Sequence, residues 1–158
     1  MTNVFEGKIL LKKIIKTKPS AFAKIYGGKT FPDILGNIEF YDFNGTSVVV
    51  STIHNLPNTN TNIFAFHIHK KGECDGKNFD SAGSHYGKET HPKHKGDMPV
   101  LFSNDGEAFM CFYTNKFKIN EIVGKSIIIH NMPDDFTTQP AGNSGERIAC
   151  GIITKIGK

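Results

Sequence analysis

The feature that most constrains the fold is a series of short segments in which apolar and polar residues alternate, separated by turn-forming residues. Residues 21–26 (AFAKIY) follow this pattern, which suits a strand because successive side chains point to opposite faces. Asn-Gly at 44–45 and Asn-Asp-Gly at 104–106 are hairpin signals. Strands are therefore predicted at residues 21–26, 37–43, 46–53, 62–69, 100–103, 107–114, 125–130 and 146–156. About eight short strands without a convincing helix indicate an all-β protein, an antiparallel sandwich or barrel.

Two long polar segments interrupt the predicted strands. Residues 70–99 hold much of the Gly, His and Asp and show no apolar periodicity of either kind, and residues 131–145 form a second polar stretch. Residues 119–123 are predicted to be a connector that can include a helical turn. Long loops in compact domains are usually functional or disordered. These two segments are therefore the first places to search for a site.

Length and charge favour one domain. A chain of 158 residues can build one full hydrophobic core, and a net charge of +4 is too mild to indicate a nucleic-acid partner. The basic run at residues 8–18 could be a membrane or nucleic-acid arm, although a solvated tail is the simpler interpretation. We expect residues 1–18 to be a basic extension or a lead-in to the first strand, and residues 19–158 to form the β-barrel domain.

No targeting segment is visible in the sequence. The apolar residues of 8–18 stand in pairs between lysines, so they do not form the apolar run of a signal peptide, and no segment approaches transmembrane length. The chain as given is therefore expected to be cytoplasmic, or periplasmic or extracellular if a leader has been removed. Three cysteines, at positions 74, 111 and 150, leave at least one thiol free.

Three histidines lie near the ends of predicted strands. His67 and His69 are two residues apart, so both imidazoles project from the same face while Phe66 and Ile68 point into the core. This places the two rings on the outer side of the barrel wall. His130 ends another strand and could join them across the sheet. Taken alone, an HxH pair or a histidine at the end of a strand is more often an ordinary surface feature than a metal site.

A second group of possible ligands lies within the long loop. Its members are His85, His91, His94 and Asp97. Three imidazoles and one carboxylate suit tetrahedral zinc. Imidazole-rich sites in general suit copper, zinc, iron and nickel, so the spacing predicts a metalloprotein without choosing a reaction.

Five motifs, taken in their order along the chain, resemble those of the copper/zinc superoxide dismutase family. They are FAFHIH at 64–69, DSAGSH at 80–85, HKGDMP at 94–99, IIIHNMPDD at 127–135 and GNSGERIACGI at 142–152. The resemblance is closest to the bacterial type, because Cys74 precedes the SAG motif by several residues and Phe79 stands where the animal enzymes have that cysteine. It implies an eight-stranded antiparallel Greek-key β-barrel or sandwich, immunoglobulin-like, with a metal loop at about 70–99 and a channel loop at about 131–145.

The resemblance also implies two sets of metal ligands. The copper ligands would be His67, His69, His85 and His130. The zinc ligands would be His85, His91, His94 and Asp97, with His85 bridging the two ions as an imidazolate. His91 takes its place as the one histidine left in the loop.

Other residues gain a role only through the resemblance. Asp134 resembles the aspartate that links a copper-ligand histidine to a zinc-ligand histidine, and Arg147 matches the active-site arginine that binds the anion. Cys74 and Cys150 match the intrachain disulfide, which makes Cys111 the free thiol. His54 has no counterpart and is expected to lie outside the site.

The activity implied is the disproportionation of superoxide to oxygen and hydrogen peroxide, with Cu²⁺ and Zn²⁺ as cofactors. Copper would be the redox centre, because zinc has no redox chemistry. His85 would supply one proton and Arg147 would bind the substrate. Four lysines are candidates to attract the anion: Lys70, Lys71, Lys93 and Lys95. The expected partner is superoxide, without nucleic acid or membrane, and a homodimer is expected because family members are often dimers.

One departure from the family keeps alternatives open. The loop between His85 and Asp97 is several residues shorter than in the family, and Tyr86-Gly87-Lys88 replaces its aromatic-Asn-Pro. A copper-only site is therefore one alternative. A second is a non-catalytic copper carrier, although such relatives typically lose copper ligands or the arginine. A third is a zinc-stapled β-sandwich that binds a partner, which would leave the strand histidines and Arg147 unexplained.

Overall fold

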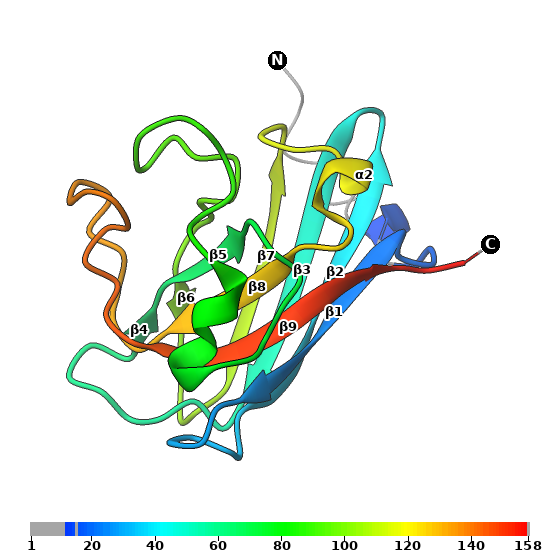
Figure 1. Cartoon of the computed structure of the whole chain (residues 1–158). Coiled ribbons are helices and arrows are strands. Elements are labelled where there is room, and N and C mark those ends of the chain that lie inside the picture. Colours follow the sequence, from blue (N-terminus) through cyan, green and yellow to red (C-terminus); the bar gives the residue numbers. More distant parts are fainter. Residues whose placement is uncertain (1–11, 15, 158) are drawn as a thin grey trace.

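The structure is a computed structural model that describes residues 12–14 and 16–157, and it consists mainly of β-strands (Figure 1). The strands are β1 (Ala21–Gly27), β2 (Leu35–Phe43), β3 (Thr46–His54), β4 (Ile63–Phe64), β5 (Phe66–His69), β6 (Leu101–Phe102), β7 (Ala108–Thr114), β8 (Ser126–His130) and β9 (Arg147–Lys155). Short helical segments include residues 12–14, η1 (Lys77–Ala82) and α2 (Ile119–Ile122). The all-β prediction is confirmed.

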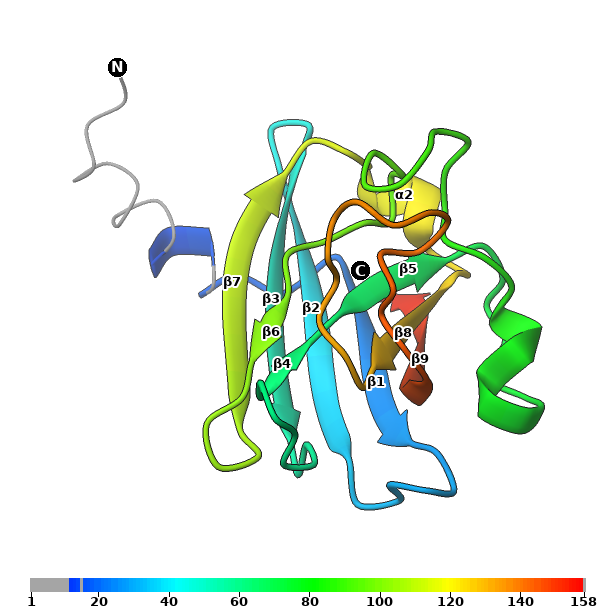
Figure 2. The same cartoon turned by 90° about the vertical axis from the view of Figure 1, so that its left-hand side faces the viewer.

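Seven of the strands form one curled antiparallel sheet that nearly closes on itself (Figure 2). Its order is β5-β8-β9-β1-β2-β3-β7, and a separate ladder joins β4 to β6, which lies against β7. The predicted fourth strand is broken at Ala65, whose backbone bonds to His130 and Met132 instead. Counted as one strand, β4 and β5 bring the total to the predicted eight. The late strands return so that β9 lies beside β1, as a Greek key requires.

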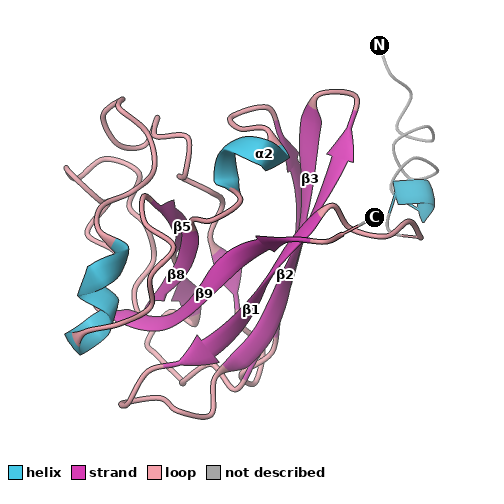
Figure 3. Ribbon diagram, turned by 45° about the vertical axis from the view of Figure 1, so that its right-hand side comes forward, coloured by secondary structure: helices cyan, strands magenta, loops and turns pink. Residues whose placement is uncertain are grey.

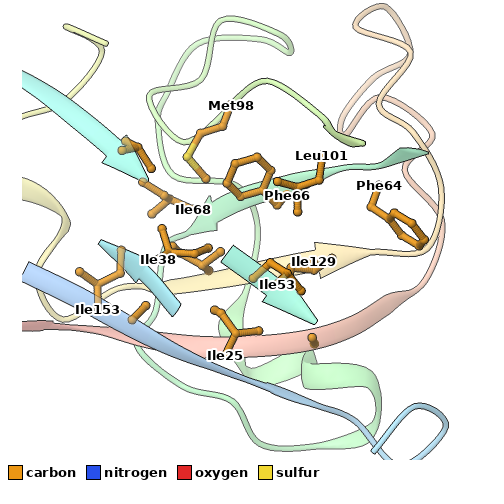
Figure 4. Close-up of a cluster of buried hydrophobic side chains, with 14 of the residues drawn as sticks. Ile25, Ile38, Ile53, Phe64, Phe66, Ile68, Met98, Leu101, Ile129 and Ile153 are labelled. Atoms are coloured by element: carbon orange, nitrogen blue, oxygen red, sulfur yellow. The ribbon is translucent and has the colours of Figure 1, made fainter. Parts of the chain in front are cut away.

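The core lies between the two curved halves of the sheet and is built mainly from isoleucine and phenylalanine (Figure 4). Strand alternation supplies it: Ile25 on β1, Ile38 on β2 and Ile53 on β3 are fully buried. Phe66 and Ile68 point into the same core from β5. The side chains between them, which point the other way, are therefore left on the outer face of the sheet, where the site is built.

The two predicted loops gather on the outer side of β5 and β8, together with η1 (Figure 3). The helix η1 was not predicted, because residues 70–99 show no helical periodicity. Its last residue, Ala82, packs with Ile128 and Cys150 on the outer face of the sheet. The Cys74–Cys150 disulfide fastens the start of this loop to β9, across a sequence separation of 76 residues. The predicted pairing is confirmed, and Cys111 is the free cysteine.

Most of the predicted N-terminal extension, residues 1–11 and residue 15, lies outside the described residues. From the part that is described, Ile14 packs against Tyr41 and Val48 on the outer face of β2 and β3. The division into 1–18 and 19–158 stays a prediction. In the described part of the chain, no helix has the length and apolar character that a membrane span needs.

Candidate metal centre

The site lies along the outer edge of β5, which is an edge strand of the seven-stranded sheet. The metal loop runs along this edge and pairs with it through two isolated bridges, His67 with Asp97 and His69 with His85. Ile68, between the two strand histidines, donates its N–H to Gly96 and accepts from Tyr86. The loop thus covers an edge that would otherwise expose unpaired backbone groups. This pairing sets the ligands of the loop beside those of the strand.

Four histidines converge on one point at this edge. Each of the four offers a ring nitrogen, and these nitrogens all lie within 4.8 Å of one another: His67, His69, His85 and His130. All four side chains are buried. The strand histidines lie on the outer face of the sheet, as their alternation with Phe66 and Ile68 indicates. The loops nevertheless cover them, so that His67 is 0% and His69 1% exposed.

The convergent nitrogens have no hydrogen-bond partner among the described residues. They are His67 Nδ1, His69 Nε2, His85 Nε2 and His130 Nε2. Buried polar atoms are nearly always paired, so four orphaned acceptors facing one another need an explanation. A metal ion bound to their lone pairs supplies it, and imidazole nitrogens suit copper. The residues present therefore fit the copper that the family motifs imply.

The other nitrogen of each ring is fixed by the protein. His69 Nδ1 donates to the carbonyl of Gly83 at 2.8 Å, and His130 Nδ1 lies 3.4 Å from the carbonyl of Gly145. His67 Nε2 is 2.8 Å from Asp134, and His85 Nδ1 is 2.8 Å from Asp97. Such partners select the tautomer and orient the ring towards the metal.

A second group adjoins the first and shares His85 with it. Its ligand atoms also lie within 4.8 Å of one another, and its members are His85, His91, His94 and Asp97. Three Nδ1 atoms surround one carboxylate: those of His85 at 2.8 Å, His94 at 3.0 Å and His91 at 3.2 Å from Asp97. The contact of His91 lacks hydrogen-bond geometry. Three imidazoles around one carboxylate fit tetrahedral zinc, despite the shortened loop.

Asp134 connects the two groups. Its Oδ2 is 2.8 Å from His67 Nε2 and its Oδ1 is 2.8 Å from His91 Nε2, and its side chain is fully buried. Burial alone would raise the pKa of this carboxyl, but the hydrogen bonds from His67, Phe136 N–H and His91 lower it. Asp134 is therefore an ionised acceptor between one ring of each group.

Burial also decides the charge of the copper-side rings. It lowers the pKa of His67 to about 4 and the pKa of His69 to about 2, because a charged ring would lose its hydration. The same cause lowers the pKa of His130 well below its usual value. These rings are neutral at pH 7, which is the form that binds metals. On the zinc side, burial would raise the pKa of Asp97, but the hydrogen bond from His85 and the neighbouring rings bring it to about 2.

Arg147 is the first residue of β9 and lies beside the copper-side ring of His69. Its Nη1 donates to the carbonyl of Phe79 at 2.8 Å and its Nη2 to that of Gly83 at 2.7 Å. Gly83 also accepts from His69, so one carbonyl positions both the guanidinium and a copper-side ring. Phe79 adopts a positive φ of 56°, an uncommon conformation for a phenylalanine. His54, in contrast, pairs with Glu107 on the exposed end of β3 and takes no part in the site.

Sequence reasoning missed several residues that build the site. The side chain of Gln139 pairs with the backbone of His91, at 3.1 Å to its N–H and 2.6 Å to its carbonyl. Gly142 has a φ of +66°, and a Cβ there would overlap Asp134 and contact His91. Lys116 binds three carbonyls of the metal loop. Nothing in the sequence pattern marks these positions, because each acts through a contact with a distant loop.

Comparison with known proteins gives a consistent result. The model of the family described as copper/zinc superoxide dismutase (SODC) matches residues 34–153. A protein of Aquifex aeolicus named superoxide dismutase [Cu-Zn] 2 is 35% identical over 138 residues, which cover 77% of this chain and 80% of the relative. The superoxide dismutase [Cu-Zn] of Escherichia coli K12 is 39% identical over 107 residues, or 56% and 62% of the two chains. The chain therefore belongs to the copper/zinc superoxide dismutase family and is similar to its bacterial members.

Proposed function

We propose that this protein disproportionates superoxide to oxygen and hydrogen peroxide at a copper ion held by four buried histidines. These are His67, His69, His85 and His130, and zinc would lie beside them on His85, His91, His94 and Asp97. The observation that carries the proposal is the set of four unpartnered nitrogens converging on one point. Family membership supplies the reaction, and the two ligand groups supply a place for both cofactors.

Copper, when bound, supplies a centre that exchanges one electron at a time, which zinc cannot do. The protein contributes position, charge and protons. His85 presents Nε2 to the copper side and Nδ1 to the zinc side, so Nε2 is the atom that would carry a proton towards the product. Its Nδ1 contact fixes the ring during this transfer. Asp134 orients His67 and His91 from behind.

Arg147 is proposed to bind the anion. Its two hydrogen bonds to carbonyls fix the guanidinium beside His69, where it can make charge-assisted hydrogen bonds to an anion. Lys70, Lys71 and Lys93 are exposed on the metal loop and add positive charge that attracts superoxide. Lys95, a fourth candidate, is paired with Glu121 at 2.7 Å. Because the histidines are buried, only a small molecule or ion would reach them.

The test is an assay of superoxide removal by the copper- and zinc-loaded protein. We expect activity in the wild type and none in His130→Ala, because one copper ligand is lost. Arg147→Ala should lose activity by about 10- to 100-fold, as expected for a charge-assisted hydrogen bond of roughly 1.5–3 kcal/mol. Its copper content should stay unchanged, whereas Arg147→Lys should retain part of the activity.

Three results would argue against this function. Unchanged activity in His130→Ala would contradict the copper site. Copper loss in Arg147→Ala would contradict the anion-binding role of that residue. A wild-type protein that binds copper but removes no superoxide would favour the copper-carrier alternative. The retention of Arg147 and of every copper-side histidine already disfavours the carrier.

We propose further that the protein is a homodimer in an oxidising compartment. The aromatic side chains of Phe102, Phe109 and Tyr113, on neighbouring strands β6 and β7, are exposed and offer an apolar surface for a second copy. Sedimentation should show twice the mass of the chain, and a monomer at all concentrations would contradict this. The Cys74–Cys150 disulfide favours the periplasm or cell exterior, since disulfides are rare in reducing compartments.

A further inference from the structure

One lysine outside both ligand groups binds the backbone of the metal loop at three points. Lys116 Nζ lies 3.1 Å from the carbonyl of Pro92, 3.2 Å from that of His94 and 3.0 Å from that of Asp97. An ammonium group has three N–H donors, so all three are used. Two of the carbonyls belong to zinc-side ligands, and Pro92 directly follows a third ligand, His91. A single side chain thus touches the backbone at or beside three of the four zinc ligands.

The segment that carries Lys116 is anchored in the core. The next residue, Phe117, is 1% exposed and packs edge-on against Phe40, with ring centroids 6.3 Å apart. Its carbonyl accepts a buried hydrogen bond from Ser47, and the N–H of Lys116 donates to Thr114. The ammonium is therefore mounted on a fixed part of the barrel. The loop that it binds has no strand or helix between Ala82 and Leu101, and its own backbone bonds are turns such as Lys93 N–H to Thr90 and Asp97 N–H to His94.

We infer that Lys116 is a positioning residue that fixes residues 92–97 so that His91, His94 and Asp97 are in place before zinc binds. The inference rests on the zinc site proposed above and concerns how that site is formed. Lys95, a cation within the same six residues, makes one contact with Glu121 near the surface, where ion pairs contribute little. Lys116 binds three carbonyls instead and acts on the path of the backbone.

The direction in which zinc affinity changes when Lys116 is replaced distinguishes a positioning role from a purely electrostatic one. A lysine ammonium near a zinc ion repels it, so removing the charge alone would strengthen zinc binding. If Lys116 positions the ligands, removing it leaves three carbonyls free and lets the loop move, so zinc binding weakens. Groups that orient metal ligands typically change metal affinity by 10- to 100-fold. The two explanations therefore predict changes in opposite directions.

The experiment compares Lys116→Met with the wild type and with Lys93→Met, which removes an exposed lysine of the same loop. Each protein is loaded with copper and zinc, and a chelator is titrated while the two metals are counted separately. Lys116→Met should release zinc at a chelator concentration about 10- to 100-fold lower than the wild type. Its copper release should shift at least tenfold less, and Lys93→Met should match the wild type.

Zinc release from Lys116→Met at the wild-type chelator concentration, or above it, would overturn the inference, and so would an equal shift in Lys93→Met. Lys116→Arg decides the matter if Lys116→Met does not fold. It keeps the charge but places its donors in a planar fork that cannot reach all three carbonyls in the same way. Lys116→Arg must release zinc at a lower chelator concentration than the wild type. Separately, Co²⁺ in the wild-type zinc site should give the visible spectrum of a tetrahedral ion, and its absence would refute the zinc assignment itself.

Discussion

At the scale of single residues, the site depends on which nitrogen of each histidine is fixed. The sequence marked these histidines as candidate ligands, because HxH on a strand and the spacing within the loop are local patterns. It could not identify the ring atoms. His67 presents Nδ1 to the copper side, whereas His69 and His130 present Nε2, because their partners differ. Those partners are distant along the chain, as with the 67 residues that separate His67 from Asp134.

A substitution of Asp134 should affect both metals. In Asp134→Asn, the amide oxygen can accept from one ring, but the NH₂ group then faces the N–H of the other. We expect the affinities for copper and for zinc each to fall by about 10- to 100-fold. Chelator titration with separate counting of the two metals is the measurement.

The neighbouring Asp135→Asn is the matched control. Asp135 is exposed and, among the residues that the structure describes, accepts hydrogen bonds only from Thr137 and Thr138 within its own loop. It should leave both affinities near those of the wild type. Asp134 has no linking role if its variant keeps either metal as tightly as this control does.

At the scale of elements, the strands and the positions of the long loops could be predicted, but the structure within the loops could not. Alternation is set within each segment, so β1, β2, β3 and β7 appear close to their predicted bounds. The break at Ala65 and the helix η1 depend on other parts of the chain. Ala65 bonds to the segment that follows β8, and Phe79 in η1 offers its carbonyl to Arg147. No window of sequence contains both partners.

The channel loop can be tested at Gly142, where the backbone φ is +66° and a Cβ would overlap Asp134. Gly142→Ala should lower the free energy of unfolding of the metal-free protein through backbone strain and a displaced Asp134–His91 hydrogen bond. Gly45→Ala is the control, because Gly45 has a φ of +83° and nothing within 4 Å. Urea unfolding should show an extra loss of roughly 1.5–3 kcal/mol for Gly142→Ala, the range for a charged hydrogen bond. Equal losses would mean that the close contact is unimportant.

At the scale of the whole molecule, the barrel provides a rigid base and the two loops complete the site. The sequence predicted a barrel with long loops, but not how the loops are fixed to it. The Cys74–Cys150 disulfide closes 76 residues and contributes about 4 to 5 kcal/mol on a chain-entropy account. Its pairing came from family resemblance, because spacing alone does not choose between three cysteines. The Lys116 contacts could not be predicted, since they join the segment that follows β7 to a loop some twenty residues earlier.

The stability of the metal-free protein should depend on pH. The pKa of His67 is about 4 when folded, against 6.5 for an ordinary histidine, and the pKa values of His69 and His130 are also lowered by burial. Above pH 6.5 neither state binds these protons. As the pH falls below 6.5, the unfolded chain takes up protons that the folded rings refuse. Each such ring then costs about 1.4 kcal/mol per pH unit until the pH reaches its folded pKa.

Thermal unfolding of the metal-free protein measures this effect. The midpoint should stay level from pH 7.5 to pH 6.5 and fall markedly by pH 5. His54→Asn, which removes the exposed histidine outside the site, should show the same fall. A level midpoint down to pH 5 would show that the three buried rings are already accessible to protons.

The shared carboxylate of Asp134 has a consequence for how such a site can change during evolution. One side chain bonds both to His67 on the copper side and to His91 on the zinc side, so any replacement of it changes the surroundings of both ions. Substitutions at this position are therefore expected to be selected against whenever either ion is needed, although no ligand except His85 belongs to both groups.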